Sequence, residues 1–343
     1  MREIIVPNSS QSLKPQRVLV LGATGTIGRA TVQALLGRGH EVVCLVRPRA
    51  GEHGTTNVES SASHLDGVEL RFADVTDPQS LIRDGFRGER FDALVSCLAS
   101  RTGAPKDAWA IDYQAHLHAL TAAQRNDVNH MVLVSAICVQ KPLLAFQHAK
   151  LAFEDALIQS GLTYSIVRPT AFFKSLSGQV ERVKQGKSFL LFGDGTMTAC
   201  KPISDNDLGN YLADCLEDEQ LHNRVLPIGG PGDAITPRLQ GEYLFRLLRR
   251  KPNFKEVPIK VLDAVVWGLG MLGRVSRPMA EKAELARIGR YYATESMLVL
   301  DPATGRYDAA ATPSTGTETL FEYYARLIAG KAEAERRDHA VFS

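Results

Sequence analysis

Residues 17–38 read RVLVLGATGTIGRATVQALLGR, and this stretch is the strongest indication of the fold class. Its first five residues are rich in branched apolar side chains, which predicts a buried strand that ends at Gly22. A helical apolar pattern then runs from about Thr26 to Arg38 and ends at Gly39. Between them, residues 22–28 match the pattern G-x-x-G-x-x-G. A glycine-rich loop between a strand and a helix is the context in which this pattern binds a dinucleotide.

The glycines of this loop have separate expected roles. Gly22 permits the tight turn, Gly25 lets the backbone approach a pyrophosphate, and Gly28 lets the helix pack against the strand. The start of the helix adds free N–H groups and the positive end of the helix dipole. The predicted cofactor contacts in the loop are Gly22, Thr24, Gly25, Thr26, Ile27 and Gly28.

The alternation of strand and helix continues as far as Pro169. Apolar strands are predicted at residues 41–46, 68–72, 93–97, 131–135 and 164–167, and helices near 77–84, 106–125 and 143–159. This order predicts right-handed βαβ crossovers and an α/β, Rossmann-like doubly wound parallel sheet. Sites in such sheets lie beyond the carboxyl ends of the strands, so residues that follow each strand are the candidates.

The end of the second strand indicates which dinucleotide binds. An enzyme that uses NAD has a carboxylate about 20 residues after the loop, which holds the ribose 2′-hydroxyl. Here the second strand ends in Val46-Arg47-Pro48-Arg49, and none of these four residues is an acid. A guanidinium suits a 2′-phosphate, so NADPH is the predicted cofactor. The alternative is that both arginines are solvated loop charges.

Later strand ends supply the remaining predicted cofactor contacts. Asp74 and Val75 follow the third strand, where they would hold the adenine; alternatively Asp74 caps the next helix. The contacts predicted after the fourth and sixth strands are Cys97, Leu98, Ala99, Pro169 and Thr170.

Ser135 ends the fifth strand, and Lys150 follows 15 residues later. This resembles the short-chain dehydrogenase/reductase family, whose site has a serine and then Tyr-x-x-x-Lys. Lys150 matches the family lysine, but the tyrosine position is Phe146, which has no proton to give. The chain therefore resembles an atypical, NmrA-like member. The resemblance implies Ser135 and Lys150 as catalytic residues, with Lys150 also holding the nicotinamide ribose. The alternative for Lys150 is a surface lysine.

Longer strings carry a more specific resemblance, from about Arg17 to about Glu322. They are VSCLASRTGAPKDAWAIDY, VSAICVQKPLLAFQHAKLAFE, TYSIVRPTAFFKSL, ACKPISDNDL, LPIGGPGDAITP and IGRYYATESMLVLDP. These strings resemble those of the divinyl chlorophyllide a (or divinyl protochlorophyllide a) 8-vinyl-reductases of chlorophyll and bacteriochlorophyll biosynthesis. The resemblance implies NADPH and reduction of a vinyl group to ethyl on a Mg-tetrapyrrole substrate. The alternative function is an NmrA-like NADPH-binding redox sensor or assembly subunit without catalysis.

A flat, apolar macrocycle with a propionate needs aromatic faces and a cation. The predicted substrate contacts are Phe146, His148, Phe172, Phe173 and Lys174. The alternatives are that Phe172 and Phe173 pack in the core and that His148 is a surface residue.

We expect residues 17–169 to form the NADPH-binding domain and residues 170–343 a smaller, mostly helical substrate part. Residues 224–228 could return to the main sheet as a strand, and residues 1–16 are expected to be a disordered lead. Ser188–Phe192 with the turn 193–195 predicts a hairpin arm. Ser204 and Thr236 are predicted to cap helices.

Composition excludes several classes of protein. The 343 residues include 40 basic and 38 acidic ones, a net charge of +2, which does not support nucleic-acid binding. The five cysteines are scattered and none has metal-ligand spacing, so no metal site is predicted. The longest apolar stretch, 261–272, is too short to span a bilayer and predicts a buried or interface helix.

The opening residues have no signal-peptide core and are too short and mixed for a transit peptide. We therefore expect a cytoplasmic bacterial protein, with peripheral contact to the photosynthetic membrane and the oligomeric state left open.

Overall fold

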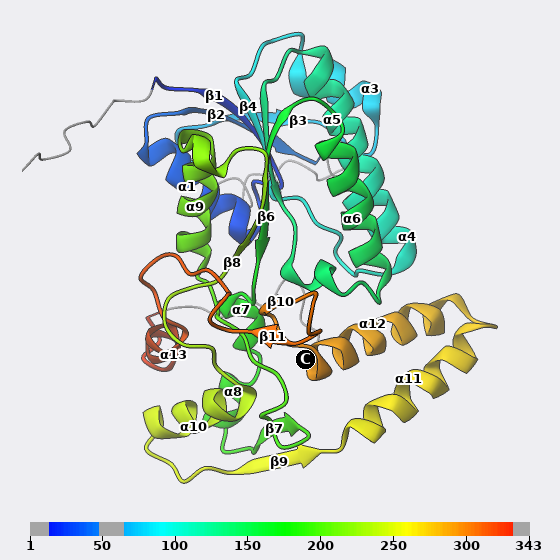
Figure 1. Ribbon diagram of the computed structural model, residues 1–343, viewed down its shortest axis with the longest axis vertical. Coiled ribbons are helices and arrows are strands. Elements are labelled where there is room, and N and C mark those ends of the chain that lie inside the picture. The colour runs from blue at the N-terminus through cyan, green and yellow to red at the C-terminus, as the bar shows by residue number, and fades with distance from the viewer. Residues whose placement is uncertain (1–13, 48–64, 332–343) are drawn as a thin grey trace, which may run out of the picture.

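The computed structural model describes residues 14–47 and 65–331. Most of the predicted disordered lead, residues 1–13, lies outside the described residues, as does Arg49. A large α/β part and a smaller part beneath it, built mainly from the second half of the chain, make up the described structure (Figure 1).

The α/β part is built on a seven-stranded sheet, which confirms the predicted fold class. Its order is β3-β2-β1-β4-β5-β6-β8, and every neighbouring pair is parallel. The strands are β1 (Arg17–Leu21), β2 (Glu41–Val46), β3 (Glu69–Phe72), β4 (Ala93–Ser96), β5 (His130–Val134), β6 (Thr163–Pro169) and β8 (Arg224–Ile228). The chain order reverses between β1 and β4, and ligands of such sheets bind at that switch point.

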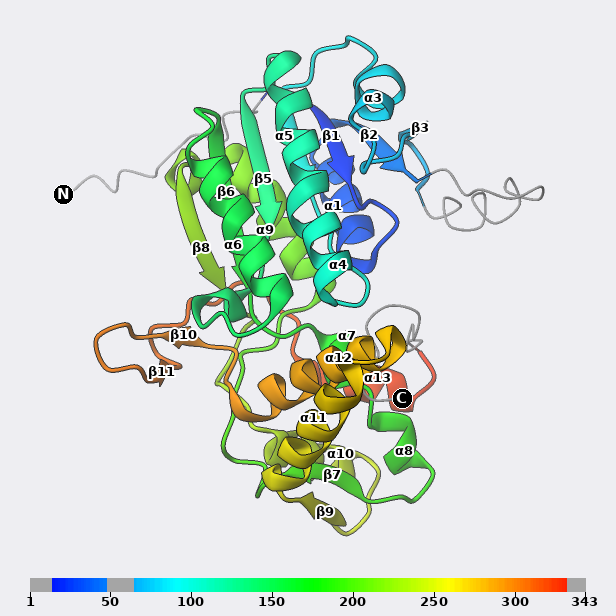
Figure 2. The ribbon, with the colours of Figure 1, turned by 90° about the vertical axis from the view of Figure 1, so that its right-hand side faces the viewer.

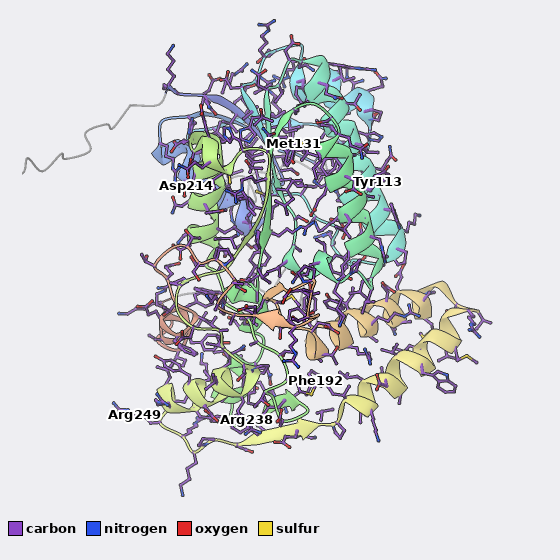
Figure 3. All side chains as sticks on the ribbon, viewed as in Figure 1. Tyr113, Met131, Phe192, Asp214, Arg238 and Arg249 are labelled. Carbon is purple, nitrogen blue, oxygen red and sulfur yellow. The ribbon has the colours of Figure 1, made fainter. Side chains whose placement is uncertain are left out.

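Helices cover both faces of this sheet (Figure 1). On one face lie α1 (Thr26–Gly37) and α9 (Asp205–Glu217). On the other lie α3 (Pro78–Ser80), a π-helical segment (Leu81–Phe86), α4 (Pro105–Ala108), a second π-helical segment (Trp109–Ala115), α5 (His116–Arg125) and α6 (Ala145–Ile158). Because both faces are covered, every residue of β4 and β5 is buried. Met131 on β5, for example, lies inside this part, as Figure 3 shows.

Two predicted helix starts are confirmed by their caps. The Ser204 hydroxyl accepts a hydrogen bond from the Asp207 amide at 3.0 Å and opens α9. The Thr236 hydroxyl accepts one from the Leu239 amide at 3.3 Å and opens α10 (Pro237–Leu247). Both α9 and β8 follow Pro169, yet β8 is a strand of the main sheet and α9 packs against it. The chain therefore crosses between the two parts more than once.

The smaller part has its own core. It contains α7 (Phe173–Leu176), α8 (Val180–Lys184), β7 (Phe189–Phe192), α10, β9 (Phe254–Val257) and α13 (Leu320–Ile328). The predicted hairpin arm at 188–195 is wrong, because β7 pairs in parallel with β9. After the turn at Gly193–Gly195 the chain runs back towards the main sheet, where Ile203 donates a backbone hydrogen bond to Ala171.

A helical hairpin projects from this smaller part (Figures 1 and 2). It consists of α11 (Ile259–Gly273) and α12 (Arg277–Thr294), and the short strands β10 (Val299–Leu300) and β11 (Tyr307–Asp308) follow. No residue of α11 is buried, and Trp267 is 71% exposed, so α11 is a surface helix and not a core helix. Among the described residues, no helix has the length and apolarity that crossing a bilayer requires.

Candidate functional site

The glycine loop after β1 has the close contacts that the motif predicts. Gly22 has a φ of +73°, and a Cβ on it would lie 2.7 Å from the carbonyl oxygen of Cys97. A Cβ on Gly28 would lie 2.1 Å from the carbonyl oxygen of Gly22. Only glycine fits at these two positions, because any side chain would push α1 or the β4 loop away. The partly exposed loop residues are Gly22, Thr24, Gly25, Thr26 and Ile27.

The start of α1 is open to an anion. Gly25 is the N-cap and offers no side chain to the first N–H groups, and the first turn of α1 has no acid. Those N–H groups lack intrahelical acceptors, so they are available to a phosphate. Lys174 adds a cation there, because its Nζ lies 3.2 Å from the Thr26 hydroxyl oxygen.

Arg47 and Asp74 lie near each other at the ends of β2 and β3. Asp74 accepts hydrogen bonds from the Thr76 hydroxyl at 2.7 Å and the Thr76 amide at 2.9 Å. The Thr76 hydroxyl bond holds the pKa of Asp74 below its usual value, and the charge of Arg47 contributes less. The helix cap is Asp77, which accepts from the Gln79 amide, so the cap alternative for Asp74 is wrong. Arg47 is exposed, whereas Val75 is buried.

The loop after β4 lies against the glycine loop. Ala99 is exposed, while Cys97 and Leu98 are partly buried. The Cys97 sulfur lies 3.5 Å from the Thr31 hydroxyl, and burial raises the pKa of the Cys97 thiol to about 11, so the thiol is neutral. At the end of β6, Pro169 is buried.

Thr170 follows β6, and both its side chain and its backbone make hydrogen bonds. Its hydroxyl donates to the Lys201 carbonyl, and its amide donates to the Ile228 carbonyl at 3.0 Å. The backbone after β6 is therefore fixed beside the loop after β8.

Lys150 is a largely buried ion-pair partner and not a surface lysine. Its side chain is only 11% exposed, and its Nζ lies 3.1 Å from Oδ1 of Asp112. The Asp112 side chain is fully buried and also accepts from the Ser100 amide at 3.2 Å. Its second oxygen, Oδ2, has no hydrogen-bond partner among the described residues. Asp112 thus connects Lys150 on α6 to the loop after β4.

A neutral histidine lies behind this pair. His116 Nδ1 is 2.9 Å from the Ile111 carbonyl, which can only accept, so Nδ1 carries the proton. Nε2 then accepts from the Ser96 hydroxyl at 2.9 Å. Burial lowers the pKa of His116 to about 4, and the charge of Lys150 adds to this effect.

The hydroxyl of Ser135 is committed to a buried network. It donates to the Glu154 carboxylate, which also accepts from Arg168 Nε at 3.2 Å. Any role for Ser135 in proton transfer would require this bond to open.

The aromatic candidates do not gather in one place. Phe146 is 9% exposed and packs in the same core as Ile288 and Tyr291 of α12. Phe173 is 3% exposed, and its ring lies 5.5 Å from that of Tyr323 in the core of the smaller part. Phe172 packs against the core of the main sheet instead. His148 lies exposed on α6.

Sequence reasoning missed three buried residues that shape this region: Asp112, His116 and Glu154. The spacing of each residue along the chain could have indicated it. Asp112 and His116 lie four residues apart in a predicted helix, and Glu154 lies four residues after Lys150, so each pair shares a helix face.

The comparisons with known proteins identify the family of the chain. A family model described as NAD(P)H-binding matches residues 22–219. The divinyl chlorophyllide a 8-vinyl-reductase of rice (Oryza sativa subsp. indica) is 51% identical over 340 residues, 97% of this chain and 84% of that one. The photosystem II assembly factor Ycf39 of Cyanophora paradoxa is 26% identical and covers 91% of this chain and 93% of its own. A solved structure of AtPrR2 with NADP⁺ and (+)pinoresinol has a TM-score of 0.65 at 18% identity, covering 91% of this chain and 99% of that one.

One expectation is overturned by these relatives. The rice protein and its counterparts from maize, cucumber and Arabidopsis are 49–51% identical to the chain, and all are named chloroplastic. The expectation of a cytoplasmic bacterial protein is therefore wrong.

The similarity to these plant reductases extends over 93–97% of the chain. The structure accordingly combines an NAD(P)H-binding sheet with a smaller part that those relatives share. The chain belongs to the divinyl chlorophyllide a 8-vinyl-reductase family.

Proposed function

We propose that this chain reduces the C8 vinyl group of a divinyl chlorophyllide or protochlorophyllide to ethyl, with NADPH as the reductant. The observation that carries the proposal is the 51% identity to the rice reductase over nearly the whole chain. The substrate is then a Mg-tetrapyrrole. The open start of α1 and the charged end of β2 supply the cofactor site that the reaction needs.

The preference for NADPH over NADH rests on the end of β2. Arg47 is exposed there, and the acid that would hold a ribose 2′-hydroxyl is absent from the described end of that strand. Asp74 lies near Arg47, but its carboxylate already accepts hydrogen bonds from the amide and hydroxyl of Thr76. A 2′-phosphate therefore meets an exposed guanidinium that can make a charge-assisted hydrogen bond.

When bound, NADPH supplies a hydride to the terminal vinyl carbon, and a proton added to the inner carbon completes the ethyl group. The developing negative charge lies next to a conjugated macrocycle, which spreads it. An aliphatic ketone places that charge on one oxygen and needs a local donor. Phe146 in the tyrosine position is consistent with this difference, because a ring without a hydroxyl cannot donate a proton.

Lys150 is the polar group best placed to orient the nicotinamide end. Asp112 fixes the ammonium on α6 beside the loop after β4, where Ala99 is exposed. We assign Lys150 to the nicotinamide ribose. We assign Ser135 a supporting role through Glu154, because its hydroxyl already donates to that carboxylate.

The two parts of the fold have different main roles. The main sheet holds most of the cofactor, and the smaller part, built from residues after Pro169, supplies most of the substrate contacts. Phe172 is only partly buried at the start of that second part, and it is the aromatic side chain that we assign to the macrocycle.

The test is turnover by the purified chain. Divinyl chlorophyllide a and NADPH are incubated with the protein, and chromatography measures the monovinyl product against NADPH consumed. We expect one monovinyl pigment per NADPH, with much slower turnover on NADH.

The second candidate function is NADPH binding without catalysis, as in a redox sensor or assembly subunit. Phe146 in place of the tyrosine and the likeness to an assembly factor favour it. NADPH binding with no pigment converted, from either divinyl substrate, would support this candidate and reject reduction.

A further inference from the structure

A lysine of the smaller part reaches the cofactor loop of the main sheet. Lys174 lies on α7, and its Nζ is 3.2 Å from the hydroxyl oxygen of Thr26, the first residue of α1. The two residues are 148 positions apart in the chain. The cation of Lys174 therefore lies at the glycine loop, although the residue follows the last strand of the predicted cofactor domain.

The packing of the two preceding phenylalanines determines the direction of the Lys174 side chain. Phe173 packs in the core of the smaller part, with 3% of its surface exposed. Phe172 packs against the core of the main sheet and forms a bridge with Ile203. Because α7 is held by both cores, the partly buried Lys174 side chain extends along the junction between them towards Thr26.

The Lys174 ammonium has no counter-charge among the described residues of this junction. Within the part of the chain that the structure describes, Lys174 has no carboxylate partner, and the first turn of α1 contains no acid. An ammonium group next to the positive end of a helix is unfavourable unless an anion lies between them. A pyrophosphate bound by the first N–H groups of α1 supplies that anion.

We propose that Lys174 binds the pyrophosphate of the dinucleotide cofactor, and that it does not bind the propionate of the substrate. The smaller part then completes the cofactor site. NADPH and NADH carry the same pyrophosphate and differ at the ribose 2′ position, so Lys174 contributes equally to both, whereas Arg47 contributes to NADPH alone.

The test measures binding of each cofactor to the protein without pigment, so it does not depend on vinyl reduction. Dissociation constants for NADPH and NADH are measured by fluorescence or calorimetry for Lys174→Met, Lys174→Gln and Arg47→Met. Lys187→Met is the matched control, because Lys187 is an exposed lysine of the same part and its loss changes the net charge equally. Melting temperatures confirm that each variant is folded.

We expect Lys174→Met and Lys174→Gln to raise both dissociation constants about tenfold or more, as for loss of a charge-assisted hydrogen bond. The ratio of NADPH to NADH affinity stays unchanged in these variants. Arg47→Met changes that ratio, and Lys187→Met changes neither constant. Unchanged cofactor binding in both Lys174 variants overturns the proposal. If a separate turnover assay of these variants then shows a higher pigment KM, Lys174 is assigned to the substrate instead.

Discussion

The buried pair of Lys150 and Asp112 makes a quantitative prediction about stability. Asp112→Ala leaves the Lys150 ammonium and the Ser100 amide without their acceptor. Breaking a buried ion pair from one side costs about 3–5 kcal/mol of unfolding free energy. Lys150 is 11% exposed, so some solvent reaches it, and we expect the lower end, about 3 kcal/mol.

Lys150→Met removes the other half of the pair. It should lower the unfolding free energy by a similar amount, because the Asp112 carboxylate then keeps only the Ser100 amide as a donor. The double variant Asp112→Ala/Lys150→Met contains neither buried charge. Its loss of stability should therefore be smaller than the sum of the single losses by about 1–3 kcal/mol.

The assay is denaturant unfolding of the four proteins without cofactor near pH 7, which completes a double-mutant cycle. The control cycle uses Arg90 and Asp127, whose charged groups are 3.3 Å apart but largely exposed. We expect a coupling below about 1 kcal/mol for that exposed pair. Additive losses at Lys150 and Asp112, or a coupling no larger than the control, would refute the assignment of a buried pair.

Three further predictions concern cofactor choice, acid catalysis and the hairpin. Arg47→Asp should weaken NADPH binding by at least tenfold and favour NADH, because a carboxylate repels the 2′-phosphate; equal binding constants in both proteins would count against this. Phe146→Tyr should change the turnover rate by less than tenfold, about 1.4 kcal/mol of barrier, and a larger gain would show that proton donation limits the wild-type rate. Trp267→Ala should lower stability by under about 1 kcal/mol, since the ring is 71% exposed, whereas a buried tryptophan costs about 3–5 kcal/mol; unfolding curves distinguish the two.

Local sequence patterns were sufficient for most of the main sheet. The β1 strand and its glycine loop have the predicted bounds, because apolar periodicity and glycine conformation are properties of neighbouring residues. The Ser204 and Thr236 caps were predictable for the same reason, since a cap bonds to an amide three residues away.

Contacts between distant segments were not predictable from such patterns. Residues 188–195 look like a hairpin, but β7 pairs with β9, which lies more than sixty residues later. Nothing near Ser135 in the sequence indicates a partner for its hydroxyl, but in the structure this hydroxyl donates a hydrogen bond to the Glu154 carboxylate. Lys174 follows two phenylalanines that suggest a substrate surface, but the packing of α7 turns it towards Thr26. Each of these outcomes depends on which residues the fold brings together.

The most direct test of the proposed reaction follows the hydride itself. The purified chain is given divinyl chlorophyllide a and NADPH that carries deuterium at the transferred position, and the monovinyl product is analysed by mass spectrometry and NMR. We expect one deuterium per product, located on the terminal carbon of the new ethyl group, and a solvent-derived proton on the inner carbon. A product with the label on the inner carbon, an unlabelled product, or no monovinyl pigment at all would refute the proposed reaction.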